Sequence, residues 1–596
     1  MASIIVVAGC LAIIARLWYL QIMRGDELYL ASEQNRTRVI RRPPPRGLIL
    51  DAEGDVLATV RSRIVLSVLP EAVEEDETLL PRLAKLVGRP RSELEATFRE
   101  NKIDSIQPVR LSWDVGLEVA TRIEERLHTL PGVMIGPEPV RTYTAGPAYG
   151  HVLGYVGQCS KEDLERRADA GYKRGDVCGK TGVEGGPFDA KLRGRDGGTT
   201  VEVDALGRVT GELATTDPVS GATLRLNIVG RLQRLAYDQL MAQARRGHPG
   251  AVVAMDPQTG AVLALVSVPS YDPALFEGGI AAADWRKLRD NPLRPLINRA
   301  VSSASAPGSV FKVFTSVAGL ETGKTGIYDS AYCSGVIHLG RWPKRCHKRS
   351  GHGSVNLIEA IAKSCDVFFY RLGQRLGPDT MAAYARMFGF GQPTGIDLPA
   401  AEAAGIVPDP EWKQRRKLGP WVGGDTVDYA IGQAMLGCTP LQVCTAVSAI
   451  ANGGTVLVPQ IVGSVIEHEP DGSEHVAPVP PRIARRLKLR PSTLPAVIRG
   501  MEAVMNPGGT ASHCSLPGIR VAGKTGTAQR RRRGEYVDDA WFVAFAPVEN
   551  PRIAVCVFVE EGGHGGATAA PIARAIIGEY LGVKAAEPSG APGAAD

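Results

Sequence analysis

The sequence lacks the features that mark several common protein classes. Its ten cysteines in 596 residues are too sparse for the disulfide scaffold of a small secreted protein. Neither sign of charge dominates, because 69 basic residues face 63 acidic ones, and a net charge of +6 over this length does not indicate nucleic acid. No second long apolar run follows the one at the N-terminus. What remains, with 44% hydrophobic and 22% charged residues, is a globular chain long enough for two or more domains.

The one long apolar stretch is found at residues 3–23, SIIVVAGCLAIIARLWYLQIM. Its length matches the about 20 residues that a helix needs to cross a bilayer, and its single charge, Arg16, can reach an interface. Trp18 and Tyr19 suit the same interface. A cleaved signal peptide would need a basic start and a small-residue cleavage site, and the stretch has neither. Residues 1–23 are therefore predicted to be an uncleaved single-pass anchor, with the rest of the chain on one side of the membrane.

The part of the chain after the anchor has an irregular pattern. Residues 25–42 are polar and predict a helical stalk, which three prolines end. Residues 46–60 alternate apolar side chains around a turn and predict a hairpin, and helical patterns follow over about 70–130. Loops and turns rich in glycine come next. We predict an irregular α+β domain over residues 24–222.

The C-terminal part of the chain has a more regular pattern. Two β-rich runs joined by the turn DPQTG come first, and a long region of helices and loops follows over about 275–450. Strand-like runs then return as VAGKTGTA, AWFVAFAP and IAVCVFVE, and a closing helix follows as PIARAIIGEYLG. Strands from both ends of a domain with helices inserted between them predict an α+β fold, an antiparallel sheet flanked by helices, over residues 223–583. Residues 584–596 are small and polar, which predicts a disordered tail.

Residues 518–529, GIRVAGKTGTAQ, match two motifs with different chemistry. The spacing of glycines before Lys524 and Thr525 fits the phosphate-binding G-x-x-x-x-G-K-[ST], and the same residues with Gly526 spell the K-T-G element of active-serine acyltransferases. A phosphate loop needs a helix that begins at the Lys-Thr pair. Here the preceding residues alternate like a strand, and another strand-like stretch follows. The phosphate-loop match is therefore interpreted as accidental.

The acyltransferase interpretation requires a nucleophilic serine three residues before a lysine. Ser309-Val310-Phe311-Lys312 supplies this S-x-x-K element at the entry to a predicted helix. A spacing of three places both side chains on one helix face. A serine hydroxyl is a weak nucleophile unless a base takes its proton, and a lysine can do so if its pKa is lowered by burial or by a nearby cation such as Lys524. Alone, S-x-x-K is common by chance.

A third element supports the acyltransferase interpretation. Ser364-Cys365-Asp366 lies between two helical patterns and offers a serine with a polar residue two positions later. A helix N-cap is the simpler explanation of such residues. In order and spacing, however, Ser309, Ser364 and Lys524 reproduce the arrangement S-x-x-K, S-x-N/D, K-T-G. Chance agreement of all three elements is improbable.

With these elements, the sequence resembles a class B penicillin-binding protein, a monofunctional transpeptidase of peptidoglycan, over nearly the whole chain. It is similar in detail to the penicillin-binding protein 2 (elongation) subfamily in PPPRGLILDAEG, HVLGYVG, GKTGVEGG, LALVSVPSYDP, GHGSVNLIEAIAKSCDVFFY, AIGQAMLGCTPLQV and AGKTGTAQ. The resemblance implies an N-terminal pedestal of the dimerisation type over 24–222 and a penicillin-recognising serine transpeptidase domain over 223–583. It also assigns the first GKTG, at 179–182, to the pedestal rather than to catalysis.

The resemblance implies catalytic roles that need no cofactor. Ser309 would attack the D-Ala-D-Ala carbonyl of a donor stem peptide, release D-alanine and form an acyl-enzyme, which the amine of a neighbouring stem peptide would attack. Lys312 would be the general base, and Ser364 would relay protons to the leaving group. Lys524 would maintain a positive field for the terminal carboxylate. β-Lactams would acylate Ser309 because they mimic the terminal dipeptide.

The resemblance also implies which residues contact the substrate. Thr525, Gly526 and Thr527 would bind it beside Lys524, and backbone N–H groups of Ser309 and Thr527 would form the oxyanion hole. The usual third residue of the second motif is Asn, and here it is Asp366. A carboxylate donates a hydrogen bond only when protonated, so its contact with a substrate amide must differ or be taken over by Lys312.

A cysteine- and histidine-rich segment lies between the first two catalytic motifs. It offers three thiols and one imidazole, the ligand set of a closed tetrahedral zinc site, in Cys333, Cys346, His352 and Cys365. Some members of the resembling subfamily carry zinc at matching positions, which implies a structural zinc that pins the segment of Ser364. A disulfide or free thiols are the alternatives, and His338 or His347 could replace the chosen histidine.

The run of arginines at 530–533 is most simply a solvated hairpin tip, and attraction of anionic stem peptides is the weaker alternative. The resemblance implies an inner-membrane protein with its catalytic domain in the periplasm. Its expected partners are peptidoglycan stem peptides, β-lactams and a membrane glycan polymerase of the shape-elongation (RodA-type) family, with no nucleic acid. The rival functions are a D,D-carboxypeptidase, a β-lactamase, and a catalytically quiet scaffold that activates the polymerase.

Overall fold

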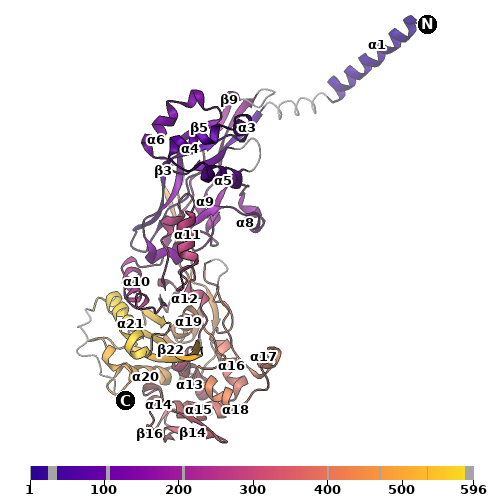
Figure 1. Ribbon diagram of the computed structural model, residues 1–596. Helices are drawn as coiled ribbons and strands as arrows, with labels where there is room; N and C mark the ends of the chain where they lie inside the picture. Colours follow the sequence, from indigo (N-terminus) through magenta and orange to yellow (C-terminus); the bar gives the residue numbers. More distant parts are fainter. Residues whose placement is uncertain are drawn as a thin grey trace. The chain divides into compact units, whose positions relative to one another are not determined.

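The computed structural model describes residues 2–24, 37–102, 108–203, 209–398, 402–468, 471–532 and 534–583 (Figure 1). The chain divides into two compact units. The first unit contains residues 1–47 and 190–222, and the second contains residues 48–189 and 223–596. The predicted disordered tail at 584–596 lies outside the described residues. The predicted domain boundary at residue 222 stays a prediction.

The first unit contains the apolar N-terminal helix. Helix α1 (Ala2–Trp18) continues as a π-helical segment, η1 (Tyr19–Met23). The stretch Ile4–Met23 is long and apolar enough to cross a membrane, and none of it is buried within the protein. Because an exposed apolar helix of this length needs a non-aqueous surrounding, the finding supports a membrane anchor.

A three-stranded sheet completes the first unit and corrects one prediction. Strand β1 (Thr37–Arg42) pairs antiparallel with β8 (Gly197–Val203), which pairs with β9 (Val209–Thr216). The helical stalk predicted over 25–42 is thus wrong for its last six residues, and residues 25–36 lie outside the described part of the chain. The β-branched residues of TRVIRR favour a strand once a partner strand is available, and the partner comes from far along the chain.

The second unit contains a mixed sheet with the strand order β19-β18-β10-β2-β3-β4, in which β5 also pairs with β3. The predicted hairpin at 46–60 is confirmed by the antiparallel pair β2–β3. Strand β10 lies between β2 and β18, so one sheet joins segments from both sides of residue 222. The strands are β2 (Ile49–Leu50), β3 (Val56–Val68), β4 (Val109–Ser112), β5 (Val133–Tyr143), β10 (Thr223–Leu226), β18 (Val462–His468) and β19 (Glu474–Pro478).

The helices predicted over 70–130 pack on this sheet. Leu66, Leu79, Leu83 and Ile123 are fully buried together and form the centre of this core. The second unit also holds a small hairpin, β6 paired with β7. The elements of this part are α3 (Pro70–Glu75), α4 (Leu79–Val87), α5 (Arg91–Asn101), α6 (Gly116–Glu124), α7 (Gly150–Leu153), β6 (Val156–Gln158), α8 (Lys161–Arg166) and β7 (Val177–Gly179), with α9 (Asp189–Arg193) at the join of the two units.

Another core of the second unit surrounds a five-stranded antiparallel sheet of order β12-β11-β23-β22-β21. As predicted, its strands come from both ends of a long segment with helices inserted between them. Every residue of β11, β12 and β23 is buried, which requires cover on both faces. The strands are β11 (Gly250–Met255), β12 (Val262–Val268), β21 (Ala522–Arg532), β22 (Glu535–Ala546) and β23 (Ile553–Val559).

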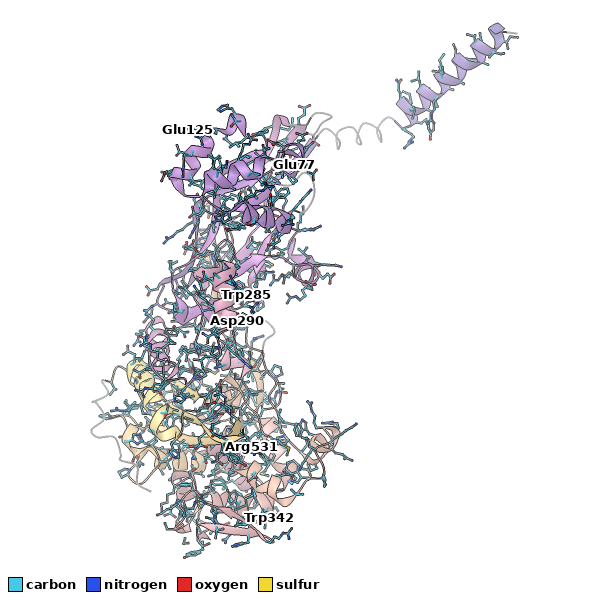
Figure 2. The ribbon with its side chains drawn as sticks, viewed as in Figure 1. Glu77, Glu125, Trp285, Asp290, Trp342 and Arg531 are labelled. Carbon is cyan, nitrogen blue, oxygen red and sulfur yellow. The ribbon has the colours of Figure 1, made fainter. Side chains whose placement is uncertain are left out.

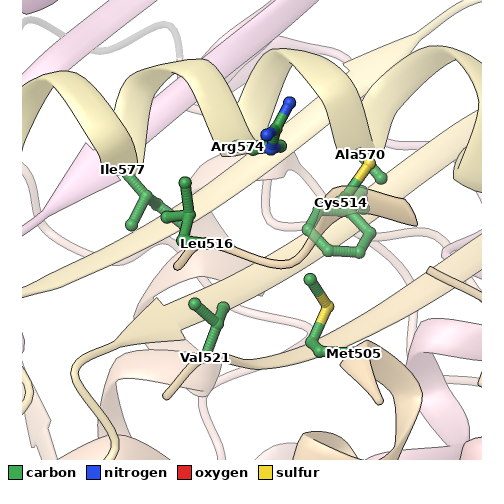
Figure 3. A pocket seen from close by; sticks show the side chains of 8 residues that line it. Met505, Cys514, Leu516, Val521, Ala570, Arg574 and Ile577 are labelled. Carbon is green, nitrogen blue, oxygen red and sulfur yellow. The ribbon is translucent and has the colours of Figure 1, made fainter. Parts of the chain in front are cut away.

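Helices α10, α19 and α21 pack directly on the five-stranded sheet (Figure 1). Figure 3 shows a small apolar pocket beneath α21, lined among others by Met505, Leu516, Val521 and Ile577, none of which is a predicted catalytic residue. The remaining helices are α10 (Gly230–Ala244), α11 (Ala282–Arg289), α12 (Arg299–Ser302), α13 (Lys312–Glu321), α14 (Leu357–Ala362), α15 (Asp366–Leu376), α16 (Pro378–Met387), α17 (Pro410–Arg415), α18 (Gly423–Ala430), α19 (Pro440–Ala451), α20 (Thr493–Met505) and α21 (Gly565–Leu581).

Short β pairs interrupt the helical region between the two halves of the sheet. Strand β13 (Ala331–Cys333) pairs with β16 (Gly353–Val355), and β14 (Val336–Leu339) pairs with β15 (Trp342–Arg345). Strand β17 (Thr455–Leu457) pairs with β20 (Ile483–Arg486). Figure 2 shows Trp342 at the lower edge of the view, and its exposed fraction of 66% places this hairpin at the surface.

Candidate active site

The S-x-x-K element lies where a short 3-10 turn, η6 (Gly308–Phe311), enters helix α13. Ser309 is half-buried in this turn, and Lys312 is the fully buried first residue of α13. Gly308 has φ of +55°, and a Cβ at this position would lie 2.5 Å from the carbonyl oxygen of Thr527. Only glycine fits both constraints, so the turn lies directly against β21.

Strand β21 carries the K-T-G element along the edge of the five-stranded sheet. Lys524 and Thr525 thus lie inside a strand rather than at the start of a helix, which agrees with the rejection of the phosphate-loop match. A Cβ at Gly526 would lie 2.7 Å from the carbonyl oxygen of Pro307. The glycine therefore lets β21 approach the turn of Ser309 closely.

The S-x-D element forms the connection between helices α14 and α15. Ser364 has φ of +51°, in the left-handed region that non-glycine residues rarely occupy. In this conformation Ser364 presents two acceptors to Lys312. The Lys312 amine donates to the Ser364 carbonyl oxygen at 2.7 Å and to Ser364 Oγ at 3.2 Å. A strained residue of this kind at a cluster of charges is typical of a functional site.

The two buried lysines and Asp366 complete the cluster. Lys312 Nζ lies 2.6 Å from Asp366 Oδ1, and Lys524 Nζ donates to Ser364 Oγ at 2.9 Å and to the Thr525 carbonyl oxygen at 2.9 Å. The Ser364 hydroxyl therefore lies between two amines. The structure thus brings Lys312, Ser364, Asp366 and Lys524 together, although up to 212 positions separate them along the chain.

The geometry also changes how Lys312 must be understood. Within the described residues, the side-chain hydrogen bonds of the Lys312 amine go to Ser364 and Asp366, and none joins it to Ser309. The carboxylate that replaces the usual amide is therefore the partner of the lysine. Lys312 is held as one member of a buried ion pair one helical turn from the candidate nucleophile.

The charges of the cluster shift one another. Burial alone would raise the pKa of Asp366, but the charge of Lys312 and a hydrogen bond with His347 outweigh it and hold that pKa well below its usual range. Burial, together with the charge of Lys312, holds the pKa of Lys524 well below that of an ordinary lysine. One of the two amines is therefore paired with a carboxylate, and the other is disposed to lose its proton.

Three of the residues predicted to contact the substrate, Thr525, Gly526 and Thr527, lie along β21, and the fourth, Asp366, begins α15. Thr525 Oγ1 is 2.7 Å from Thr510 Oγ1, and Gly565 N–H donates to Thr527 Oγ1 at 3.5 Å. Gln433 Nε2 donates to the Thr527 carbonyl oxygen at 3.2 Å. Because β21 is an edge strand, its outer side can pair with an extended peptide.

Sequence reasoning missed a buried carboxylate that supports the site. Asp539 on β22 is fully buried, accepts from Arg530 Nε at 2.9 Å, and accepts from Ser305 Oγ at 3.0 Å. Ser305 lies four residues before Ser309, so Asp539 connects the start of the catalytic turn to the sheet. Asp539 directly follows a second Asp, and because every residue of β22 from Asp539 onward is buried, the sequence carries no alternation that would have singled it out.

The same contacts correct the interpretation of the arginine run. Arg530 lies within β21 and forms ion pairs with Asp539 and Glu561, and Arg532 also pairs with Glu561. Arg530 is therefore part of the sheet rather than of a solvated tip. Arg531, labelled in Figure 2, is exposed, and Arg533 lies outside the described residues.

The four predicted metal ligands lie together beside the S-x-D element. Their ligand atoms all lie within 4.8 Å of one another, and they belong to Cys333, Cys346, His352 and Cys365. His352 Nδ1 is 3.7 Å from Cys333 Sγ and 3.6 Å from Cys346 Sγ. Tetrahedral zinc with Zn–S near 2.3 Å and Zn–N near 2.05 Å would separate such atoms by about 3.6 Å. The donors therefore fit a tetrahedral zinc ion.

One thiol of this cluster is already disposed to ionise, as a metal ligand must be. A hydrogen bond from Cys365 lowers the pKa of the Cys346 thiol to about 3, while the same contact raises the pKa of Cys365. None of the three cysteines is in a disulfide in the structure. His347 belongs to a second group of possible metal ligands, with Cys346 and Asp366. Its backbone N–H donates to Asp366 Oδ2 at 2.8 Å.

Comparison with known proteins identifies the family. A family model described as the penicillin binding protein transpeptidase domain matches residues 250–578, and one described as the penicillin-binding protein dimerisation domain matches residues 41–226. The chain belongs to the penicillin-binding proteins. Both matches fall on the predicted α+β segments, and the first contains the whole cluster around Ser364.

Relatives of this penicillin-binding protein cover almost its full length. The peptidoglycan D,D-transpeptidase MrdA of Acinetobacter baumannii is 34% identical and the match covers 96% of this chain and 86% of the relative. The MrdA protein of Haemophilus influenzae is 34% identical, with 95% and 88% covered. The resemblance to the penicillin-binding protein 2 subfamily, inferred from the motifs, is confirmed.

Solved structures of the same subfamily match the fold. The penicillin-binding protein PBP2 of Helicobacter pylori, in a complex with MreC, has a TM-score of 0.80 and 29% identity, with 92% of this chain and 99% of that chain covered. The PBP2 of Pseudomonas aeruginosa in complex with WCK 5153 has a TM-score of 0.68 and 30% identity, with 91% and 97% covered. The predicted α+β fold with a transpeptidase domain is thereby confirmed.

Proposed function

We propose that this penicillin-binding protein is a peptidoglycan D,D-transpeptidase that cross-links stem peptides through an acyl-enzyme on Ser309. The observation that carries the proposal is the single buried cluster of Lys312, Ser364 and Lys524 beside the turn of Ser309. The names of the MrdA relatives support the same activity. The edge strand β21 offers an extended peptide a place beside this cluster.

The acylation step uses groups that the geometry places in order. Ser309 Oγ bonds to the carbonyl carbon of the penultimate D-Ala, and the C–N bond to the terminal D-Ala breaks. Lys312, one helical turn away, takes the Ser309 proton, and the Ser364 hydroxyl carries a proton to the departing amine. The amine of a second stem peptide then attacks the ester and restores the Ser309 hydroxyl. Thr525 and Thr527 on β21 hold the donor peptide.

The two lysines have different roles but contact the same hydroxyl group, that of Ser364. Lys312 can accept the Ser309 proton only when its amine is neutral. Ser364 Oγ lies 3.2 Å from Lys312 Nζ and 2.9 Å from Lys524 Nζ, which connects the two amines by hydrogen bonds. A substrate carboxylate near Lys524 favours its protonated form. The Ser364 hydroxyl therefore offers a path along which a proton can pass between the two amines.

The test uses the full-length protein in detergent. Incubation with a penicillin is expected to add one penicilloyl group by intact mass, and Ser309→Ala is expected to add none, while Ser473→Ala, in an exposed turn, behaves as wild type. In a separate reaction without penicillin, the wild-type protein should convert uncross-linked glycan strands into cross-linked products. An adduct on Ser309→Ala would overturn the nucleophile assignment. Release of D-alanine without cross-links would favour a carboxypeptidase, and no adduct on folded protein would favour a scaffold.

We also propose that Cys333, Cys346, His352 and Cys365 hold a structural zinc ion. Bound zinc would supply a rigid cross-link of low chemical reactivity rather than catalysis. Cys365 directly follows Ser364, so fixing this thiol to the β13–β16 pair holds the strained Ser364 in place. Cys346 directly precedes His347, whose N–H contacts Asp366. The ligands thus support both polar residues of the S-x-D element from opposite sides.

Metal analysis of the full-length protein tests the zinc proposal. We expect one zinc per chain in wild type and in Cys514→Ser, whose thiol lies outside the cluster, and much less in Cys333→Ser. A strong chelator should lower the Tm and slow penicillin acylation of wild type. Metal-free protein with an unchanged Tm in the chelator, or a disulfide within the cluster, would contradict the proposal.

We further propose that the anchor spans the inner membrane and that the catalytic residues face the periplasm, with a RodA-type glycan polymerase as partner. The solved complex of a penicillin-binding protein 2 with MreC and the matched structure of a peptidoglycan synthase complex support a membrane assembly of this kind. In intact spheroplasts, an external protease should cleave the second unit. Protection from the protease would contradict the periplasmic location. Failure to co-purify with the polymerase would contradict the proposed partner.

A further inference from the structure

Two cysteines that the proposed reaction and the zinc cluster do not use lie against each other at the base of the β6–β7 hairpin. Cys159 directly follows β6, and Cys178 is the middle residue of β7. The strands are antiparallel, with Gly157 opposite Cys178, and the Cys159 N–H donates to the Asp176 carbonyl oxygen at 2.8 Å. The pairing therefore continues past the end of β6 and places both thiols on one face of the hairpin.

The two thiols lie in one small core. Cys159 is 8% exposed, Cys178 is 0% exposed, and Tyr172 closes the cluster over them, with Leu164 packed at its side. Both are free thiols in the structure, and both belong to this one packed cluster.

This pair differs from the zinc cluster in a way that decides its chemistry. Within the described residues, the groups of metal-type donors include Cys346 and Cys365 but neither Cys159 nor Cys178. A pair of thiols without further donors cannot form a closed zinc site, which takes four ligands. In an oxidising compartment, two adjacent thiols without a metal are expected to form a disulfide.

We infer that Cys159 and Cys178 form a disulfide that closes the β6–β7 hairpin. The inference rests on the proposed periplasmic location, because that compartment supplies the oxidant. A thiol–disulfide donor provides the reaction: the two cysteines lose two electrons and two protons, one S–S bond forms, and the donor disulfide is reduced to two thiols. Formation belongs to folding of the hairpin, before Tyr172 covers the sulfurs.

The surroundings of the pair favour this exchange. The hydrogen bond from Cys159 and the nearby charge of Lys180 lower the pKa of Cys178, although burial opposes them. Cys178 is therefore the thiol that ionises first, and a thiolate is the attacking species in exchange. The pKa of Cys159 is raised by the same contact.

The bond would stabilise the segment that follows the hairpin. Arg167 Nη2, from within the hairpin, donates to the Gly179 carbonyl oxygen at 2.7 Å and also contacts Gly185. A disulfide next to Gly179 ties both strands to this arginine and so to residues 179–186. This segment carries the buried ion pair between Glu184 and Arg141, whose atoms lie 2.5 Å apart.

Peptide mapping of the full-length protein tests the inference. The protein is purified in detergent without reductant, denatured in N-ethylmaleimide and digested with trypsin. We expect residues 142–161 joined to residues 175–180, without maleimide on either cysteine, and separation of the two peptides after reduction. Cys514 serves as the internal control, since a single buried thiol should carry maleimide. Maleimide on both Cys159 and Cys178 would overturn the inference for the protein as the cell makes it.

A second measurement separates the chemistry of the pair from its location. Protein that is denatured and reduced with dithiothreitol is refolded in detergent in a buffer of oxidised and reduced glutathione, and the same linked peptides are followed over time. We expect the link to return in wild type, and Cys159→Ser to carry glutathione or maleimide on Cys178 instead. Thiols that stay free at equilibrium would refute the disulfide. Penicillin acylation of the same sample reports on Ser309 separately, so failure of the proposed function is distinguishable from failure of the disulfide.

Discussion

The amine of Lys524 is buried, and two effects disfavour its positive charge. Burial removes the water that would solvate it, and the charge of Lys312 repels it. Such a residue lowers stability in exchange for reactivity, a common feature of catalytic sites. In the unfolded chain a lysine has a pKa of about 10.4. Folding lowers it, so between the lowered pKa and about 10.4 the unfolded chain binds more protons than the folded one, and the contribution of Lys524 to stability rises with pH. At pH values below the lowered pKa, Lys524 is protonated in both states, and the full free-energy cost of burying its charge remains.

Lys524→Met removes this cost together with the hydrogen bond to Ser364. We expect the Tm of the variant minus the Tm of wild type to fall as the pH is raised from about 7 to about 9.5. Over that range the wild-type protein becomes more stable, because the unfavourable charge on Lys524 is lost. Penicillin acylation should be lost at every pH. Differential scanning calorimetry measures the first effect and intact mass the second. In the control Lys488→Met, at an exposed position, the difference should not depend on pH, and a pH-independent difference for Lys524→Met would refute the argument.

Gly526 tests how closely β21 must approach the catalytic turn. In Gly526→Ala the new Cβ would lie 2.7 Å from the Pro307 carbonyl oxygen, so the strand and the turn must separate. Overpacking of this kind costs about 1–3 kcal/mol. We expect a lower Tm and penicillin acylation at least about tenfold slower, since small displacements at a reacting centre cost rate. Gly424→Ala, in helix α18 with no atom within 4 Å of the new Cβ, should neither lower the Tm nor slow acylation. Normal acylation by Gly526→Ala would show that the close approach is dispensable.

At the scale of secondary-structure elements, the site depends on three elements from distant parts of the chain. The turn η6, the α14–α15 connection and β21 each carry one motif, and glycines and ion pairs hold them together. Asp539 on β22 is the connection that belongs to none of the motifs. It binds Arg530 from the sheet and Ser305 from the segment that leads into Ser309.

Asp539→Asn is therefore expected to loosen the catalytic turn as well as the sheet. Removal of one partner of a buried ion pair costs about 3–5 kcal/mol, and partial exposure of Arg530 reduces this to about 2–3 kcal/mol. Penicillin acylation should slow more than in Ser305→Ala, which loses only one hydrogen bond. Chemical denaturation and the acylation rate give the two readouts. Arg531→Gln, at an exposed neighbouring position, serves as the control, and wild-type values for Asp539→Asn would contradict the role of this contact.

At the scale of the whole molecule, membrane attachment and catalysis belong to different parts of the chain. All residues of the candidate site lie in the second unit, while the apolar helix belongs to the first and has no buried residue. Deletion of residues 1–24 should move the protein from the membrane fraction to the soluble fraction and leave penicillin acylation within about twofold of wild type. Fractionation and intact mass measure the two properties. Loss of acylation in folded, soluble protein would show that the anchor contributes to the site.

The sequence by itself determined the secondary structure around the site and the set of candidate residues. The hairpin at 46–60, the two groups of sheet strands and the order of the three motifs follow from local patterns, because periodicity and turn residues act within a few positions along the chain. The stalk was predicted wrongly where it depended on a distant partner. Residues 37–42 form a strand only because β8 pairs with them.

Tertiary structure alone decided which charges meet. The ion pair of Lys312 with Asp366 spans 54 positions and the contact of Lys524 with Ser364 spans 160, so no local pattern could reveal them. The support by Asp539 and the contact of Cys159 with Cys178 arise in the same way, from the path of the chain and from burial. Burial decides the ionisation of these groups, since a charge removed from water must find a partner or lose its proton.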